Sequence, residues 1–385
     1  MIPLAVPNLA GREAEYLQAC VDSTFVSSVG AFVERFEQLV GSEAGTGGAV
    51  AVSSGTTGLH LALRALGVGP GDLVVLPSLT FIASANAIAH CGASPWLFDV
   101  TDASWTLDAE QVAAVFDERL DAGADGAVER STGRRVAAVM PVHTLGHPAE
   151  MDPIVETARS FGIPVVADAA AALGATYRDR PIGRSGATVS VFSFNGNKTV
   201  TAGGGGALVS EDQALLARAR HLSTTARTSP DYDHDDVGYN YRMTNLQAAV
   251  GCAQMEQLAT FVAAKRRIQA FYDARLGHHP HVEVFPRSSW ASSACWFAGV
   301  LVEGWTPPQV EALRVELRQV GIDARPFWKP MHLQRPYAAA PREPTPVTDR
   351  IWPRVLVLPC STGITTDELE RVADAADRAL AGSAP

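Results

Sequence analysis

One strand–helix–strand unit can be identified in residues 49–77, AVAVSSGTTGLHLALRALGVGPGDLVVLP. The two apolar runs at its ends, 49–52 and 73–77, have the length and composition of buried strands. Between them, Leu59, Leu63 and Leu66 recur with the spacing of one helix face, and the sequence VGPGD then predicts a turn. A helix that connects two apolar strands is typical of a parallel sheet with covered faces.

The same alternation continues to about residue 210. Strands are expected at 94–100, 136–142, 164–168, 188–194 and 206–210, and helices at 81–90 and 153–161. The polar, glycine-containing segment 119–135 is expected to be a surface excursion. The fold class is therefore α/β, with a mostly parallel central sheet flanked by helices. In such sheets, ligands bind beyond the carboxyl ends of the strands.

The pattern changes after residue 250. A long helix carrying Met255, Leu258 and Val262 is expected to bridge to a smaller part of mixed α+β character. That part contains a predicted strand at 296–302 and predicted helices at 307–320 and 366–381. We therefore expect two domains: residues 1–250, a large ligand-binding domain with an N-terminal arm, and residues 251–385, the bridging helix with a small C-terminal domain.

Composition excludes several classes of protein. The chain has 385 residues, 47% of them hydrophobic, and a formal net charge of −10. This balance argues against a nucleic-acid partner. The five cysteines are scattered, no metal-binding motif is found, and no apolar run reaches the length of about 20 residues that a membrane helix needs. The first residues lack the basic region of a signal peptide. We expect a soluble, cytoplasmic protein that binds no metal.

Three features at strand ends are candidates for chemistry. In SSGTTGLHL (53–61) a helix begins directly after a strand, which is either ordinary capping or an anion site made by free backbone N–H groups. Asp168 ends the strand PVVAD and is either a cap or a carboxylate facing the ligand crevice. Lys198 lies in the polar loop SFNGNKTVTAGGGG, where a lone lysine is usually solvated.

Taken together, the three features match the chemical groups of pyridoxal 5'-phosphate. The helix start would take the phosphate, Asp168 would pair with the protonated pyridine nitrogen, and Lys198 would form a Schiff base with the aldehyde. The glycine run that follows Lys198 would let the backbone pass close to a bulky group.

With these residues identified, the chain resembles the DegT/DnrJ/EryC1/StrS sugar aminotransferases, which are fold-type I pyridoxal phosphate enzymes. The similarity covers nearly the whole chain and includes LPSLTFIASANAI, DAAAALGA, GYNYRMTNLQAAVG and RPFWKPMHLQRPY. It is most similar to the subgroup that aminates nucleotide-linked 4-keto-6-deoxy-hexosamines. The resemblance implies L-glutamate as the amino donor. It also implies that Gly55, Thr56 and Ser193 hold the phosphate and that Phe81 stacks on the ring.

The resemblance has two further implications. Asn240, in GYNYR, would reach the cofactor of a second subunit, so we expect a homodimer with shared active sites. The family usually has Gln or Glu where this chain has Ala171, close to the ring phenol oxygen, which affects the tuning of the cofactor. The side chains that we predict to contact substrate are His143, Asn195, Arg227, Lys329 and His332, with Arg325 and Arg335 as further candidates for the diphosphate.

Competing functions remain open from the sequence. A sugar dehydratase or deoxygenase could use the same fold, although relatives of that kind often replace the lysine with histidine, and this chain keeps Lys198. A nucleotide-binding oxidoreductase would also suit alternating strands and helices, but the G-x-G-x-x-G fingerprint is absent. A catalytically silent cofactor-binding regulator receives slight support from Ala171, but no DNA-binding segment is found.

Overall fold

A sheet of short, buried strands forms the centre of the molecule. In the computed structural model, which describes residues 1–123 and 126–382, most side chains of these strands are buried. Continuous apolar runs such as AVAV and LVVLP suit strands that are covered on both faces. The strands of this region are β1 (Ala49–Val52), β2 (Leu73–Pro77), β3 (Ser94–Phe98), β4 (Leu120–Gly123), β5 (Gly126–Glu129), β6 (Arg134–Val139), β7 (Val166–Asp168), β10 (Val189–Ser193) and β11 (Gly206–Val209).

The strand order places the predicted site residues at one edge. One set of strands runs β1-β11-β10-β7 and the other β3-β2-β6-β5-β4. Parallel bridges from Val139 to Val165 and from Val142 to Asp168 join the two sets between β6 and β7. β11 is antiparallel to both of its neighbours, whereas β10 and β7, β2 and β6, and β2 and β3 are parallel. The predicted fold class is confirmed.

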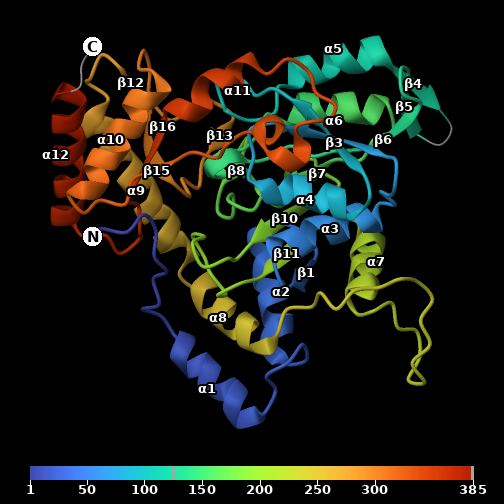
Figure 1. Ribbon diagram of the computed structural model, residues 1–385. Helices are drawn as coiled ribbons and strands as arrows, with labels where there is room; N and C mark the ends of the chain where they lie inside the picture. Colours follow the sequence, from blue (N-terminus) through green and yellow to red (C-terminus); the bar gives the residue numbers. More distant parts are fainter. Residues whose placement is uncertain (124–125, 383–385) are drawn as a thin grey trace.

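Helices cover both faces of this sheet (Figure 1). Val50 and Val52 of β1 pack on one side, in a core that includes α3, α4 and α7, while Ala49 and Ala51 pack on the other side with α2, α5, α6 and α8. This alternation follows from the two-residue period of a strand. The helices are α1 (Glu13–Ser23), α2 (Ala31–Glu43), α3 (Gly55–Ala65), α4 (Ile82–His90), α5 (Ala109–Arg119), α6 (Met151–Ser160), α7 (Gln213–Ser223) and α8 (Asn245–Met255).

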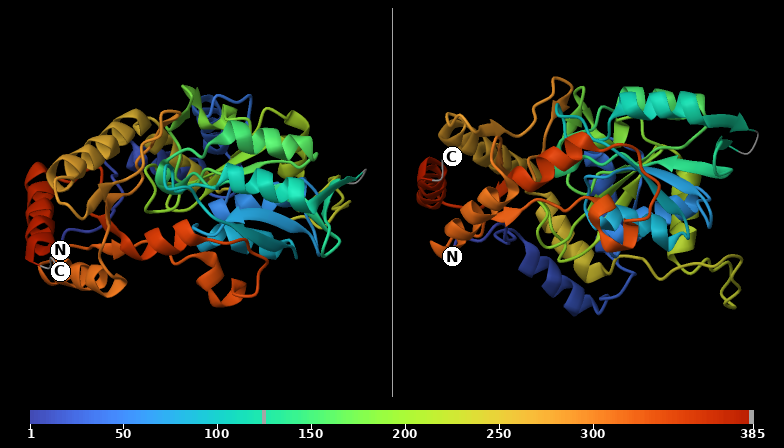
Figure 2. Two further views of the ribbon diagram at one scale, coloured as in Figure 1. Left: turned by 90° about the horizontal axis from the view of Figure 1, so that it is seen from above. Right: turned by 45° about the horizontal axis from the view of Figure 1, so that its top comes forward.

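A second, antiparallel sheet lies to one side of the first, with both chain termini close to it (Figure 2). Its strand order is β12-β14-β16-β15, and its core is separate from those of the central sheet. The remaining elements are α9 (Leu258–Leu276), β12 (Val282–Val284), β14 (Ala298–Val302), α10 (Pro307–Gln319), β15 (Arg325–Pro326), α11 (Pro346–Ile351), β16 (Val355–Leu358) and α12 (Thr366–Gly382), with a small sheet of β8 (Thr176–Tyr177), β9 (Arg180–Pro181) and β13 (Ala291–Ser292).

The chain between α8 and α9 differs from the prediction. The single long helix predicted through Met255, Leu258 and Val262 is wrong, because the helical path ends at α8 and restarts at α9. Gln257, between them, has φ −108° and ψ 2°, and Glu256 bonds to Tyr16 and Arg35 of the N-terminal helices. The proposed division at residue 250 falls within α8 and stays a prediction.

The excursion predicted at 119–135 contains β4 and β5, which pair with each other in antiparallel fashion, and β5 also pairs with β6. Residues 124–125 of this prediction lie outside the described residues. Among the helices described, none is both long and apolar enough to cross a membrane.

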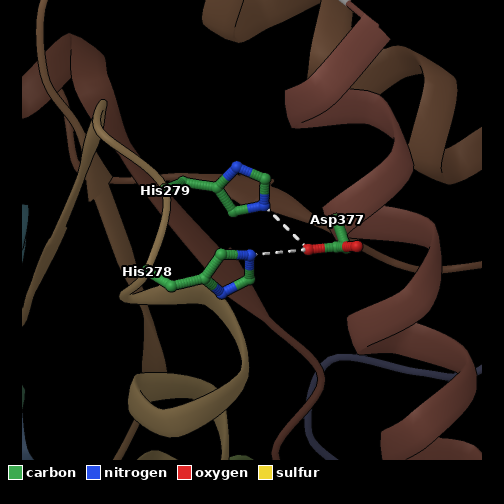
Figure 3. Close-up of side chains that lie close together, drawn as sticks. All are labelled: His278, His279 and Asp377. Atoms are coloured by element: carbon green, nitrogen blue, oxygen red, sulfur yellow. Dashed lines mark hydrogen bonds and ion pairs between the residues drawn. The ribbon is translucent and has the colours of Figure 1, made fainter.

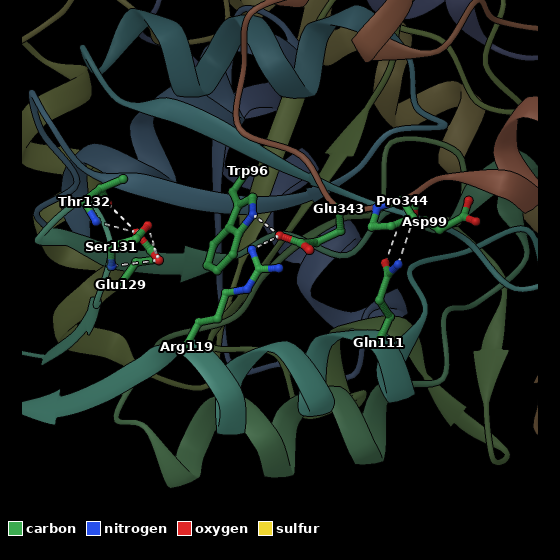
Figure 4. A network of polar contacts seen from close by, with 9 residues as sticks. All are labelled: Trp96, Asp99, Gln111, Arg119, Glu129, Ser131, Thr132, Glu343 and Pro344. Carbon is green, nitrogen blue, oxygen red and sulfur yellow. Dashed lines mark hydrogen bonds and ion pairs between the residues drawn. The ribbon is translucent and has the colours of Figure 1, made fainter.

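A polar network fixes the C-terminal segment 341–344 along β3 (Figure 4). Glu343 accepts hydrogen bonds from the Trp96 indole and the Arg119 guanidinium, each at 2.9 Å. The Gln111 amide donates to the Pro344 carbonyl at 2.9 Å. Backbone bonds from Leu97 to Pro341 and from Glu343 to Leu97 complete the contact. The segment thus covers the edge of β3, which would otherwise present unpaired backbone groups.

Candidate active site

A cavity of about 620 Å³ lies between the carboxyl ends of the central strands and the C-terminal sheet. β7 ends at Asp168 and β10 ends at Ser193, and the chain after β1 turns into α3 at the same edge. Arg325 of β15 and Val357 of β16 form part of the opposite wall. Most predicted cofactor residues meet here, together with two predicted substrate contacts: Gly55, Thr56, Phe81, His143, Asp168, Ser193, Asn195 and Lys198.

Lys198 is held in a tight turn directly after β10. Its backbone N–H donates to the Asn195 carbonyl at 2.9 Å. The ε-amine lies 3.4 Å from the ring centroid of Trp296, whose indole N–H donates to the Asn197 carbonyl at 2.7 Å. Burial lowers the pKa of Lys198 to about 7, and the charge of Asp168 opposes this shift. A large part of the amine is therefore neutral near pH 7, as a nucleophile must be.

The chain has only three lysines, and two of them are placed elsewhere. Lys265 is buried in the C-terminal part, where its ε-amine donates to the Cys360 carbonyl at 2.6 Å. Lys329 is exposed and does not line the cavity. Among the described residues, Lys198 is therefore the lysine available to a ligand in this cavity.

Asp168 is a buried carboxylate whose charge the protein only partly balances. Its oxygens accept hydrogen bonds from the Ser84 hydroxyl at 2.7 Å and from the Ala170 backbone N–H at 3.1 Å. Burial nevertheless raises the pKa of Asp168, although these bonds and the charge of Lys198 act in the opposite direction. A cationic partner in the cavity would stabilise the ionised form.

The start of α3 is capped by its own side chains and lies beside the cavity. Ser54 and Thr57 form a reciprocal capping box, with distances of 3.1 and 3.0 Å between each hydroxyl and the other residue's backbone nitrogen. Gly55 and Thr56 line the cavity, and the first N–H groups of a helix have no acceptor within it. A Cβ on Gly55 would lie 2.8 Å from the Cβ of Ser193, so glycine permits this close approach. An anion would be stabilised here.

An aromatic wall faces these polar groups. Phe81, at the N-terminus of α4, is 54% exposed, and its ring centroid lies 5.9 Å from that of Trp328. Trp328 in turn lies 5.9 Å from Trp296 and 4.7 Å from Phe327. The resemblance implied that Phe81 stacks on the cofactor ring, whereas neither tryptophan was predicted to line the cavity. The signal available in the sequence was that both tryptophans are next to a phenylalanine, in WF (296–297) and FW (327–328).

Arg325 brings a fixed positive charge to the same cavity. Its guanidinium makes two hydrogen bonds to Asp323, at 3.1 and 2.8 Å, and its side chain is 60% exposed. Asp323 also accepts a bond from the Leu4 backbone N–H, so it ties the N-terminal arm to this wall. Such a pair holds the arginine in one orientation while leaving part of it free to bind an anion.

Other predicted residues lie away from this cavity. Arg227 and Asn240 are exposed and line a separate surface hollow together with Ser28 and Arg242. His332 is buried, and its ring nitrogens contact the Ser78 hydroxyl at 2.7 Å and Asp349 at 2.9 Å. Lys329, His332 and Arg335 do not line the cavity, so their substrate contacts stay predictions.

Comparisons with known proteins identify the family. Residues 7–377 match the DegT/DnrJ/EryC1/StrS aminotransferase family. The chain belongs to this family. It is 38% identical to a GDP-perosamine synthase of Caulobacter vibrioides over 98% of each chain, and 35% identical to one of Escherichia coli O157:H7 over 96% of this chain and 95% of the other. The crystal structure of the aminotransferase TlmJ from Streptoalloteichus hindustanus superposes with a TM-score of 0.89, with 28% identity and 99% coverage of both chains.

Membership establishes the reaction class and the cofactor. The protein is a pyridoxal phosphate-dependent sugar aminotransferase, as the sequence predicted. The cavity fits this cofactor in three ways: it offers a partly neutral lysine, a buried carboxylate that lacks a full counter-charge, and a helix start next to a hydroxyl. Lys198 would hold the aldehyde, and Asp168 would hold the ring nitrogen. The phosphate would be held by Gly55, Thr56 and Ser193.

Proposed function

We propose that this aminotransferase moves an amino group from L-glutamate to a nucleotide-linked 4-keto-6-deoxy sugar. The names of two relatives, both GDP-perosamine synthases, describe enzymes that make a nucleotide-linked amino sugar. The observation that carries the proposal is the arrangement of Lys198 and Asp168 at one sheet edge, facing Arg325 on the opposite wall of the cavity. We also propose a cytoplasmic location, which the five free cysteines support.

The residues have separate tasks in this reaction. Pyridoxal phosphate, when bound, supplies an electrophilic aldehyde and a ring that accepts electrons. Lys198 would hold the cofactor, and its ε-amine would move the proton at the substrate carbon as base and then as acid. Its lowered pKa suits both roles near neutral pH. Asp168 would keep the ring nitrogen protonated, and the hydrogen bond from Ser84 orients its carboxylate.

The wall formed by Arg325 and Trp328 is proposed to select the sugar substrate. A nucleotide sugar carries a diphosphate, and a guanidinium binds phosphate oxygens with two parallel hydrogen bonds. Arg325 is already oriented by Asp323 and faces the cavity. The apolar ring of Trp328, in the same wall, is suited to the face of a sugar or base.

We further propose that two copies of the chain share their active sites. The segment between α7 and α8 projects from the body of the molecule (Figure 1). It carries Arg227 and Asn240, outside the cavity of their own chain. Ser28, which lines the same hollow, is close in sequence to exposed apolar side chains at Phe25, Val26 and Val29. Mixing the inactive variants Lys198→Ala and Asn240→Ala should restore activity if each site uses both chains, and the absence of recovery would contradict sharing.

The function is tested with purified protein, L-glutamate and a panel of GDP-, UDP- and dTDP-linked 4-keto-6-deoxy sugars. We expect a product in which an amino group has replaced the keto oxygen, with 2-oxoglutarate formed in equal amount. Loss of water from the sugar without gain of nitrogen would instead indicate a dehydratase. Failure of every nucleotide sugar, with amination of free keto sugars, would contradict the proposed substrate class.

A further inference from the structure

Three potential metal ligands converge outside the active-site cavity, at the junction of α9 and α12. His278 and His279 directly follow the end of α9, and Asp377 lies on α12 (Figure 3). The Nε2 atoms of the two histidines lie 3.5 and 2.8 Å from the same carboxylate oxygen of Asp377. Within residues 1–123 and 126–382, these form the one group of three or more such ligands whose atoms all lie within 4.8 Å of one another.

The geometry of the group is close to that of a zinc site. Zinc bonds histidine nitrogen and carboxylate oxygen at about 2.0–2.2 Å, so tetrahedral ligands are about 3.3 Å apart. The two separations from Asp377, 2.8 and 3.5 Å, lie on either side of that value. The ligand atoms of the two histidines lie within 4.8 Å of each other, and the His278 side chain, which is 64% exposed, has room to rotate and complete the triangle.

Neighbouring contacts orient the ligands before any ion binds. The rings of His278 and His279 are stacked, with centroids 4.4 Å apart. Arg275, one turn earlier in α9, pairs with Glu370 and Asp374 of α12. Asp377 follows Asp374 by three residues and therefore lies on the same face of α12. These ion pairs hold the two helices in the register that brings Asp377 to the histidines.

The local electrostatics favour a cation. Both histidines lie beyond the C-terminus of α9, where unpaired carbonyl groups give the helix its negative end. Asp377 adds a full negative charge, and neutral imidazole is the form of histidine that binds metal. Two imidazoles and one carboxylate leave one tetrahedral position for water.

We propose that His278, His279 and Asp377 form a zinc site that fastens the end of α9 to α12. From the sequence we expected no bound metal, because it contains no metal-binding motif. His279 and Asp377 are 98 residues apart in the chain, so no local motif joins them. The bound ion would replace the contacts of the imidazoles with Asp377 by three coordinate bonds. This stabilises the C-terminal sheet and its helices, and it is independent of the proposed substrate.

The test uses the tag-free holoenzyme, treated with a chelator, dialysed and titrated with zinc chloride by calorimetry. We expect one saturable zinc per chain. His279→Ala and Asp377→Asn should each weaken binding by about 100-fold or more, because loss of a ligand exceeds the typical cost of losing an outer-shell partner. His281→Ala is the matched control, since His281 lies two residues away and outside the group, and it should bind as the wild type does.

Thermal unfolding provides a readout that does not depend on catalysis. At a zinc concentration 100 times the dissociation constant, the melting temperature of the wild type and of His281→Ala should rise by about 3 °C. The other two variants should show no rise when each is compared, with zinc and in chelator, against itself. Absence of zinc binding by the wild type, or unchanged binding by both variants, would overturn the proposal.

Discussion

The two walls of the active-site cavity differ in how their polar groups are held. On the central sheet, Asp168 is 5% exposed and is fixed by Ser84 and a backbone N–H. On the C-terminal side, Arg325 keeps 60% of its side chain exposed and has one side-chain partner, Asp323. One wall is buried and surrounded by short strands, and the other is formed by a two-residue strand and the aromatic segment that follows it.

We infer that the buried wall carries the catalytic groups and that the exposed wall recognises the substrate. Groups that move protons need a fixed geometry and shifted pKa values, which burial at strand ends provides. Groups that recognise a large substrate need open, complementary surface. We therefore expect substitutions on the sheet wall to lower kcat, and substitutions on the C-terminal wall to raise KM for the sugar.

The largest effect is expected for Lys198→Ala. Removing the amine abolishes covalent attachment of the cofactor and the acid–base step, so kcat should fall by about 10⁴-fold or more. Steady-state assays with glutamate and the keto sugar measure this loss. Arg159→Ala, which removes an exposed cation at the end of α6 and outside the cavity, is the control and should keep its kcat. Appreciable turnover by Lys198→Ala would remove Lys198 from the mechanism.

Asp168→Asn should have the next largest effect. The amide cannot keep the ring nitrogen protonated by charge, and we expect kcat to fall by about 10²–10³-fold, as for loss of a preorganised electrostatic contact. Ser84→Ala, which only loosens the carboxylate, should lower kcat less. If Ser84→Ala proves as damaging as Asp168→Asn, the contribution of Asp168 is structural.

Arg325→Gln tests the other wall. Loss of a charge-assisted contact to the diphosphate should raise KM for the nucleotide sugar by about 10–100-fold with a smaller change in kcat. KM for glutamate should stay within about threefold of the wild type, because the diphosphate belongs to the sugar substrate. A selective rise in KM for glutamate would assign Arg325 to the donor carboxylate and contradict our assignment.

The smallest expected effect concerns pH. A lysine reacts with the aldehyde only in its neutral form, and burial lowers the pKa of Lys198 to about 7. Attachment of pyridoxal phosphate to the apoprotein should therefore be half-maximal near pH 7, and about tenfold slower at pH 6 than above pH 8. Stopped-flow absorbance of the yellow form measures this rate. A rate that keeps rising towards pH 10 would show an ordinary, solvated amine.

The proximity of the two polar residues on the sheet wall could be predicted from local sequence. Asp168 and Lys198 each follow an apolar strand, and the carboxyl ends of parallel strands meet at one edge, so their proximity could be inferred from the pattern and the resemblance. The contacts of Trp296 with Lys198 could not be inferred in this way, because they join residues about 100 positions apart across two sheets.

The same physical reason explains the other differences. The helix predicted through Met255 continues in periodicity, but Glu256 is turned towards Tyr16 and Arg35, which are distant in sequence. Arg325 was one of several candidate cations, and only its pairing with Asp323 and its place in the cavity separate it from Lys329 and Arg335. The break between α8 and α9 and the position of Arg325 both depend on tertiary contacts, which the local sequence does not show.

The most direct test is to reduce the cofactor-loaded protein with borohydride and map the modified residue by peptide mass spectrometry. The chain has three lysines, so the result is unambiguous. We predict that the pyridoxyl group is found on Lys198 alone. Its presence on Lys265 or Lys329, with Lys198 unmodified, would contradict the account of this active site.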